Sequence, residues 1–257
     1  MILLQYIFKN NTLMKPFLTK IIPIFLLMTL LPSVNADDHE NEIVISALEY
    51  YLIENQDALI AKHQELSNLL KEQDQKQLQL EIMFHEFLIA DMSSKKIKKK
   101  YSQLCTESTE SILDEGEIES ELYAILSACF GLSAEANLFR AASHGTKSGK
   151  MIEKALELDS NNSFNNMVKG IGDYTRPAFA GGNKSRAITY LKKAIDLAKS
   201  NNDRQSSLLT AIASFHLANI AFQQREFDTS SKYLDRSLEI APTYKKAKNL
   251  KAKLSRN

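Results

Sequence analysis

The chain has 257 residues, with 32 Lys and Arg against 31 Asp and Glu, so its formal net charge is +1 at pH 7. A balance of this kind offers no electrostatic basis for binding nucleic acid or an anionic membrane surface, and we expect neither as a partner. The length is sufficient for one substantial core or for a short stack of repeated units.

Residues 1–36 have the composition of a secretory signal peptide. Lys15 and Lys20 precede an apolar run from Ile21 to Leu31, and Val34-Asn35-Ala36 has small or branched residues at the two positions that a signal peptidase reads. The alternative is an uncleaved anchor, but the run falls short of the roughly 20 apolar residues that a membrane-spanning helix needs. We therefore expect cleavage after Ala36, export to the periplasm and no stable membrane insertion.

The rest of the chain has the pattern of an all-α protein. Strand signals are nearly absent, and apolar residues recur three and four positions apart. Residues 37–115 contain neither Gly nor Pro, whereas all eight glycines lie between Gly116 and Gly182. We expect an N-terminal helical or capping region at 37–115, repeats with a C-terminal capping helix at 116–257, and about 10–12 helices in all.

Cys105 and Cys129 are the only cysteines of the chain. In an oxidising exported compartment they could form a disulfide that closes a loop of about 24 residues. They could equally remain two buried thiols on helices that never meet, because sequence spacing does not establish the geometry that a disulfide requires.

Three nine-residue stretches share one pattern. They run over 151–159, 190–198 and 233–241, and each consists of an aromatic residue or Met, an aliphatic residue, two polar residues, a small residue and then alternating aliphatic and other positions. A small residue stands three positions upstream of each: Ser148, Ala187 and Ser230. The stretches begin 39 and 43 residues apart, a period that predicts stacked helical hairpins, each burying its apolar face on the next.

The clearest unit runs from Ser214 to Pro242. Its first helix has a large residue followed by a small one, Leu217 and Ala218, and its second has the small, large, small series Ser230, Leu234 and Ser237. Two helices cross closely only where side chains are small, and large residues fill the space alongside. Pro242 suits the first turn of a following helix, where its missing N–H costs nothing.

This pattern resembles the tetratricopeptide repeat, a family of right-handed helical-hairpin solenoids that bind other proteins. The resemblance implies that the first helix of each hairpin lines a concave binding face. In the best unit the outward positions of that helix would be Ile212, Phe215, Asn219 and Phe222, a candidate site for an extended peptide or an apolar ligand. The alternative is that Phe215 and Phe222 pack as core.

The preceding unit carries Ile171-Gly172 in its first helix and Ala187, Leu191 and Ala194 in its second. The turn between them contains Pro177, Gly181 and Gly182, and Asn183 precedes the second helix as a plausible N-cap. This Pro-Gly-Gly turn is similar to that of tetratricopeptide-like proteins associated with tripartite (TRAP-type) transporters of bacterial periplasms, which implies a transporter accessory role. In the unit before it, we expect the first helix to end at 129–132 and a long connection to follow.

No motif for catalysis, a cofactor or a metal stands out. The stretch 145–150, Gly-Thr-Lys-Ser-Gly-Lys, echoes a phosphate-binding loop but has three residues between its glycines instead of four, and no Ser or Thr after the last Lys. The five histidines are scattered and none has a partner at metal-ligand spacing. We expect a non-catalytic scaffold or adaptor without cofactor, with a ligand-binding or channel component of a TRAP-type transporter as the alternative. The lysine-rich end of the chain, 242–257, is expected to form a solvated capping helix.

Overall fold

The computed structural model describes residues 36–72, 76–113, 119–201 and 203–256. Within these ranges the chain forms eleven α-helices, one short 3-10 helix and no strand, which confirms the predicted all-α fold. Residues 41–257 form one compact unit, and residues 1–40 are a separate unit. The predicted signal peptide falls outside the described residues except for Ala36, where the first described helix begins.

Four of the described helices precede the repeats. They are α4 (Ala36–Leu52), α5 (Gln56–Glu72), α6 (Lys76–Met92) and α7 (Lys95–Leu113). Helices α5, α6 and α7 pack on one another in sequence, and α7 packs on the next helix, α8 (Ser120–Ala136). One hydrophobic core extends from Ala47 in α4 to Leu250 near the end of the chain, so it is continuous across the expected boundary between residues 115 and 116.

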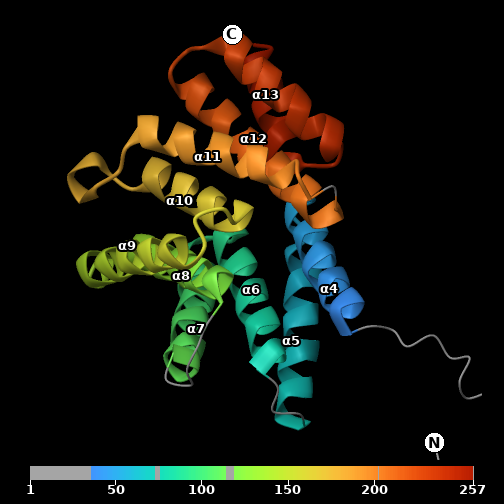
Figure 1. Ribbon diagram of the computed structural model, residues 1–257, viewed down its shortest axis with the longest axis vertical. Coiled ribbons are helices and arrows are strands. Elements are labelled where there is room, and N and C mark those ends of the chain that lie inside the picture. Colours follow the sequence, from blue (N-terminus) through green and yellow to red (C-terminus); the bar gives the residue numbers. More distant parts are fainter. Residues whose placement is uncertain (1–35, 73–75, 114–118, 202, 257) are drawn as a thin grey trace, which may run out of the picture. The chain divides into compact units, whose positions relative to one another are not determined.

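Three helical hairpins follow, visible in Figure 1 as successive pairs of neighbouring helices. The first pairs α8 with α9 (Ala141–Leu158), the second pairs α10 (Ser163–Thr175) with α11 (Lys184–Ala198), and the third pairs α12 (Arg204–Gln223) with α13 (Phe227–Ile240). Helix α14 (Lys245–Leu254) packs on α12 and α13. The first helices of the hairpins also touch in sequence, α8 to α10 and α10 to α12, so together they form one layer.

Ser148 and Ser230 occupy equivalent crossings in the first and third hairpins. Both are buried, at 5% and 0% exposure. The Ser127 hydroxyl donates a hydrogen bond to the Ser148 carbonyl oxygen at 2.8 Å, and the Ser230 hydroxyl donates to the Ala218 carbonyl oxygen at 2.9 Å. In each case a small hydroxyl side chain lets one helix approach the backbone of the other and satisfies a polar group there.

The second hairpin crosses at Gly170. A Cβ atom at Gly170 would lie 2.7 Å from Cγ of Leu191 and 3.1 Å from the carbonyl oxygen of Ala187, whereas one at Gly172 would meet nothing within 4 Å. Ala187 is therefore at a close crossing like Ser148 and Ser230, as predicted, but the choice of Gly172 as its small partner was wrong. The sequence offers two glycines two positions apart, and only the packing shows which of them faces α11.

The other predicted repeat positions are buried, except for Pro242. Leu191, Ala194, Leu217, Leu234 and Ser237 are all buried, as the repeat pattern predicts. Pro242, however, is exposed in the turn that precedes α14, which begins only at Lys245, so it is not in the first turn of that helix.

The first hairpin has a short connection where a long one was expected. Helix α8 continues past residue 132 to Ala136, and α9 begins at Ala141 after the turn at 137–140. The stretch 145–150 consequently lies inside α9, where its backbone N–H groups are directed along the helix and cannot form a phosphate-binding loop. The interpretation of 129–132 as the end of a helix failed because Gly131 is tolerated within one; a Cβ there would lie 3.5 Å from the Ser148 hydroxyl.

Cys105 and Cys129 form a disulfide between α7 and α8. Both residues are fully buried, and their Cα atoms are 5.9 Å apart. The bond ties the N-terminal helices to the first hairpin, and the chain-entropy model gives a loop of this length about 3 kcal/mol of stabilisation.

We predict opposite effects for two glycine substitutions in α10. Gly170→Ala should lower the free energy of unfolding by about 1–3 kcal/mol, because the new methyl group overlaps Leu191. Gly172→Ala is the matched control: its methyl group meets open space, so the better helix propensity of Ala should raise stability by about 0.5–1 kcal/mol. Urea unfolding of both variants checks this, and equal effects would contradict the crossing at Gly170.

Candidate functional site

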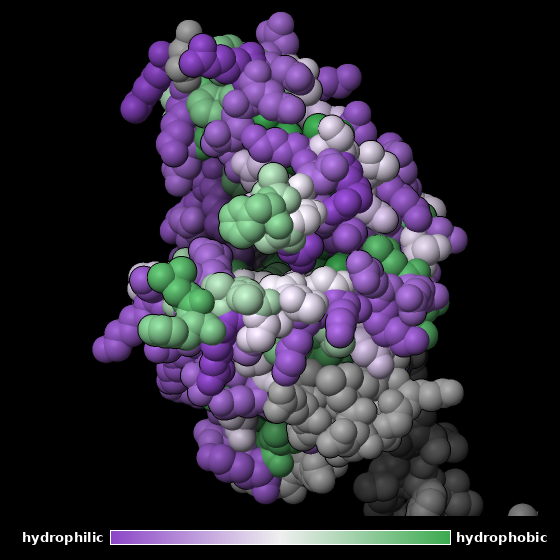
Figure 2. Space-filling view, turned by 90° about the vertical axis from the view of Figure 1, so that its left-hand side faces the viewer, coloured by the Kyte–Doolittle hydropathy of each residue, from purple (hydrophilic) through white to green (hydrophobic). Residues whose placement is uncertain are grey.

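The main candidate site is an apolar cleft with a volume of about 1220 Å³. Residues of α8, α10 and α12, the first helix of each hairpin, line it together with residues of α4, α6 and α9. Figure 2 shows apolar side chains gathered on both sides of a hollow in this face of the molecule. The deeper apolar lining includes Leu48, Phe84, Leu88, Phe164, Met167 and Ile212.

Two turns carry exposed apolar side chains at the mouth of the cleft. In the turn between α8 and α9, Leu138 lines the cleft at 85% exposure, and its neighbour Phe139 is fully exposed. In the turn between α10 and α11, Phe179 lines the cleft at 94% exposure. Exposed apolar side chains that gather at one place often mark an interaction site, so this mouth is a candidate contact surface.

Glycine geometry shapes the turn that presents Phe179. The turn begins at Pro177 and contains a short 3-10 helix, Ala178–Ala180, labelled η1. Gly181 follows with φ of +88°, in the left-handed region that favours glycine. At Gly182 a Cβ atom would lie only 1.8 Å from the carbonyl oxygen of Arg176, so no other residue fits this conformation.

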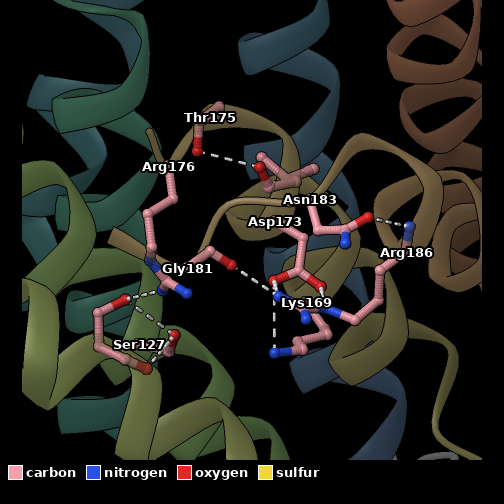
Figure 3. A network of polar contacts seen from close by, with 10 residues as sticks. Ser127, Lys169, Asp173, Thr175, Arg176, Gly181, Asn183 and Arg186 are labelled. Atoms are coloured by element: carbon pink, nitrogen blue, oxygen red, sulfur yellow. Dashed lines mark hydrogen bonds and ion pairs between the residues drawn. The ribbon is translucent and has the colours of Figure 1, made fainter. Parts of the chain in front are cut away.

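A polar network holds the same turn against α10 and α11 (Figure 3). The Arg186 guanidinium donates to both carboxylate oxygens of the buried Asp173, at 2.5 and 2.8 Å, and to the Gly181 carbonyl oxygen at 2.8 Å. Lys169 adds an ammonium 3.4 Å from Asp173. The hydrogen bond to Asp173 raises the pKa of Arg186 above its ordinary value. A bidentate, partly buried pair of this kind fixes geometry as well as charge, so Phe179 sits on a rigid support.

Asn183 completes this turn. Its side-chain oxygen accepts a hydrogen bond from the Arg186 backbone N–H at 2.9 Å, which confirms the predicted N-cap of α11. Its own backbone N–H donates to the Asp173 carbonyl oxygen at 2.8 Å. On the other side of the turn, Arg176 donates to the Ser148 hydroxyl at 3.4 Å, a contact with α9.

A second polar cluster lies at the cleft wall formed by α4 and α6. The Tyr51 hydroxyl donates to Asp91 at 2.5 Å, and the Lys246 ammonium of α14 lies 2.8 Å from the Tyr51 oxygen and 2.9 Å from Asp91. Burial alone would raise the pKa of Asp91, but the Lys246 charge and the two hydrogen bonds outweigh it and lower the pKa. Burial likewise opposes the charged form of Lys246, yet Asp91 raises its pKa.

The Lys246 contacts correct the expectation of a wholly solvated C-terminal helix. Lys245 and Lys248 are exposed as expected, but Lys246 points inward, with its ammonium also 4.6 Å from the centre of the Tyr51 ring. The contact between Lys246 and Tyr51 therefore joins residues almost 200 positions apart in the chain. Nearby, Arg204 at the start of α12 makes a second such contact, 2.9 Å from Glu49 of α4.

Of the four predicted binding residues on α12, only Ile212 lines the cleft. The ring of Phe215 lies 5.2 Å from that of Tyr244, just before α14, and the ring of Phe222 lies 5.9 Å from that of Phe227 at the start of α13, so both rings pack within the fold. Asn219 donates to the hydroxyl of the cleft residue Tyr174 at 3.2 Å. Whether any of the four contacts a partner stays a prediction.

The residues that α12 presents to the cleft are Ile212, His216 and Gln223. Sequence reasoning missed the last two because α12 is buried on several sides, with every residue from Leu208 to Ser214 buried, so periodicity does not single out one outward face. It also missed Leu138, Phe139 and Phe179. Their only signal in the sequence was a large apolar residue placed in a turn.

The described residues show no cluster of three or more His, Cys, Asp or Glu side chains placed to hold a metal ion. Within the same ranges, no helix has the length and apolar character needed to cross a bilayer.

His216 generates a prediction about acid stability. Its burial, followed by the nearby Lys246 charge, lowers its pKa from 6.5 to about 4, while Asp91 acts weakly in the opposite direction. Between pH 6.5 and 4 the unfolded chain binds a proton that the folded chain resists, so stability falls on acidification by up to about 1.4 kcal/mol per pH unit. His216→Gln should remove this part of the pH dependence.

Urea unfolding of the wild type and of His216→Gln at pH 7, 6 and 5 measures this pH dependence of the free energy of unfolding. His85, which is buried at the α5–α6 packing and whose pKa is also lowered to about 4, should account for a similar part and serves as the parallel variant, His85→Gln. Identical pH profiles for wild type and His216→Gln would contradict the assignment.

One family model matches this chain. Residues 211–244 match a model described as a tetratricopeptide repeat. The matched segment contains most of α12, all of α13 and the turn that leads to α14. A search of curated proteins finds no match to the sequence. The match covers the third hairpin and, within an all-α stack of helical hairpins, supports the tetratricopeptide-repeat superfamily.

Proposed function

We propose that this protein is an exported, non-catalytic scaffold whose cleft binds an apolar segment of a partner protein. The tetratricopeptide match supports protein interaction in general. The observation that carries the specific proposal is the cleft itself, which the first helices of three successive hairpins line and whose mouth carries Leu138 and Phe179 in water.

The size and character of the cleft favour a protein segment as its occupant. At about 1220 Å³ it exceeds the roughly 300–1,000 Å³ typical of small-molecule pockets. Large apolar side chains that enter such clefts commonly supply most of the binding free energy of an interface. Aromatic residues presented on a rigid turn, as Phe179 is, lose little conformational freedom when they bind.

Site-specific photo-crosslinking tests the cleft. We expect p-benzoylphenylalanine in place of Phe179 to yield one or a few recurrent protein adducts in living cells, because this side chain borders the occupied cleft. The matched control is the same amino acid in place of Leu158, which is 50% exposed and lies outside the cleft. Adducts are identified by mass spectrometry.

A second change connects the adducts to the cleft. Leu138→Ser, in the other turn that carries an exposed side chain of the cleft lining, should reduce the yield of the adducts formed from position 179. Equal adducts from positions 179 and 158, or a yield that Leu138→Ser leaves unchanged, would argue against the cleft as the binding site.

Export is part of the proposal and rests on residues 1–36. The apolar run after Lys15 and Lys20 and the small residues before Asp37 support it. We expect the protein in the periplasmic fraction to begin at Asp37, which amino-terminal sequencing or intact-mass measurement reads directly. A product that keeps the leader and remains in the cytosolic fraction would contradict export.

The second candidate is a ligand-binding or channel accessory component of a TRAP-type transporter. Two observations favour it: the turn formed by Pro177, Gly181 and Gly182, and the apolar cleft of about 1220 Å³. Native mass spectrometry of the protein purified from its host separates the candidates. A bound small molecule of constant mass supports the transporter role, whereas the crosslinked protein partner supports the scaffold.

A further inference from the structure

The two turns at the cleft mouth lie in segments that contain no acidic residue. Residues 136–152, which include Leu138 and Phe139, have two lysines and one arginine and no Asp or Glu. Residues 174–195, which include Phe179, have three lysines and two arginines and again no acid. We call the parts of these segments that border the cleft, residues 138–150 and 176–184, the lower and upper lips.

Four of the lip cations form no ion pair within the described part of the chain. Arg176 and Lys184 line the cleft itself, while Arg140 and Lys150 are exposed on the lower lip. None of these four side chains forms an ion pair with a described acidic residue. Within the described residues, the Arg176 side chain donates a hydrogen bond only to the neutral Ser148 hydroxyl.

The acids that line the cleft are already paired. Asp91 lies 2.9 Å from the Lys246 ammonium, and Glu135 lies 2.7 Å from the Lys98 ammonium. The cleft therefore combines an apolar interior with a mouth of net positive charge, although the whole chain is nearly neutral.

We propose that the lips select a partner segment in which an apolar core is flanked by Asp or Glu residues. This inference rests on the proposed function and adds the chemistry of the partner. The apolar core would contact Phe179, Leu138 and the cleft interior, and the acidic flanks would meet the four unpaired cations. Complementary charges at the edge of an interface accelerate association and reject partners of the wrong charge.

An anionic membrane surface also offers negative charge and apolar groups to the lips, but its shape fits the cleft less well. The apolar surface does not stop at the exposed lips; it continues inward to Phe84, Met167 and Ile212, which are at least 90% buried. A flat bilayer surface cannot reach these side chains, whereas a chain segment can enter between the lips.

Selection from a phage-displayed library of random dodecapeptides tests the proposal on the full purified protein. Wild-type protein should select peptides with an apolar core and acidic flanks. The charge-reversed double variant Arg140→Glu with Lys184→Glu should select basic flanks instead, and should bind a synthetic wild-type-selected peptide about tenfold more weakly at low salt. Both residues are exposed, so the fold should tolerate the changes.

The matched control carries the same change of charge away from the cleft. Lys245→Glu with Lys248→Glu alters two exposed lysines of α14 that do not line the cleft, and it should select the wild-type consensus. A wild-type consensus with an apolar core but no charge preference would overturn this inference and leave the proposed function standing. Failure to select any peptide would overturn both.

Lipid vesicles provide the second arm. Wild-type protein should bind vesicles of phosphatidylglycerol no more strongly than the charge-reversed variant does. Strong binding that the lip charge reversal abolishes, with no peptide consensus, would assign the lips to a membrane surface and overturn the proposal.

Discussion

Close approach of two helices requires a small residue at their crossing, and this steric constraint organises the carboxyl-terminal half of the protein. At two of the crossings a serine hydroxyl also donates a hydrogen bond to a backbone carbonyl oxygen of the facing helix, Ser127 to Ser148 and Ser230 to Ala218. Gly170 meets the constraint by having no side chain. These crossings hold each hairpin together; the first helices α8, α10 and α12 also touch in sequence, and together with α4, α6 and α9 they line the cleft.

Electrostatic contacts between distant parts of the chain complete the cleft wall. Lys246 brings the last helix to Tyr51 and Asp91, and Arg204 brings α12 to Glu49. An exposed ion pair such as Arg204–Glu49 contributes little to stability. The Lys246 cluster is different, because its members are partly buried and joined by hydrogen bonds, so loss of one would leave another desolvated and unpaired.

The functional proposal depends on a rigid turn more than on the repeat itself. Asp173 is wholly buried under Arg186, and the glycine at 182 fits where no Cβ could. Such a turn can hold Phe179 exposed to water without collapse onto the core, and Arg176 and Lys184 of the same segment line the same cleft. The apolar cleft and its basic lips then act as one surface: the helices supply the buried apolar lining, and the lips supply the positive charge.

The sequence by itself determined what depends on local spacing. It predicted an all-α chain, the second helices of three hairpins through Ser148, Ala187 and Ser230, the Asn183 cap and the turn at 176–182, because helix periodicity, capping and turn chemistry act within a few residues. It also identified the repeat that the family model matches at 211–244.

Only the tertiary structure decided which neighbour each side chain meets. Gly170 and Gly172 are chemically identical, and the position of Leu191 alone distinguishes them. Phe215 belongs to the packing with Tyr244, while His216 beside it lines the cleft, a division that a helix buried on several sides does not encode in its periodicity. The Cys105–Cys129 bond and the Lys246 cluster join residues on different helices, and local pattern carries no information about which helices will lie side by side.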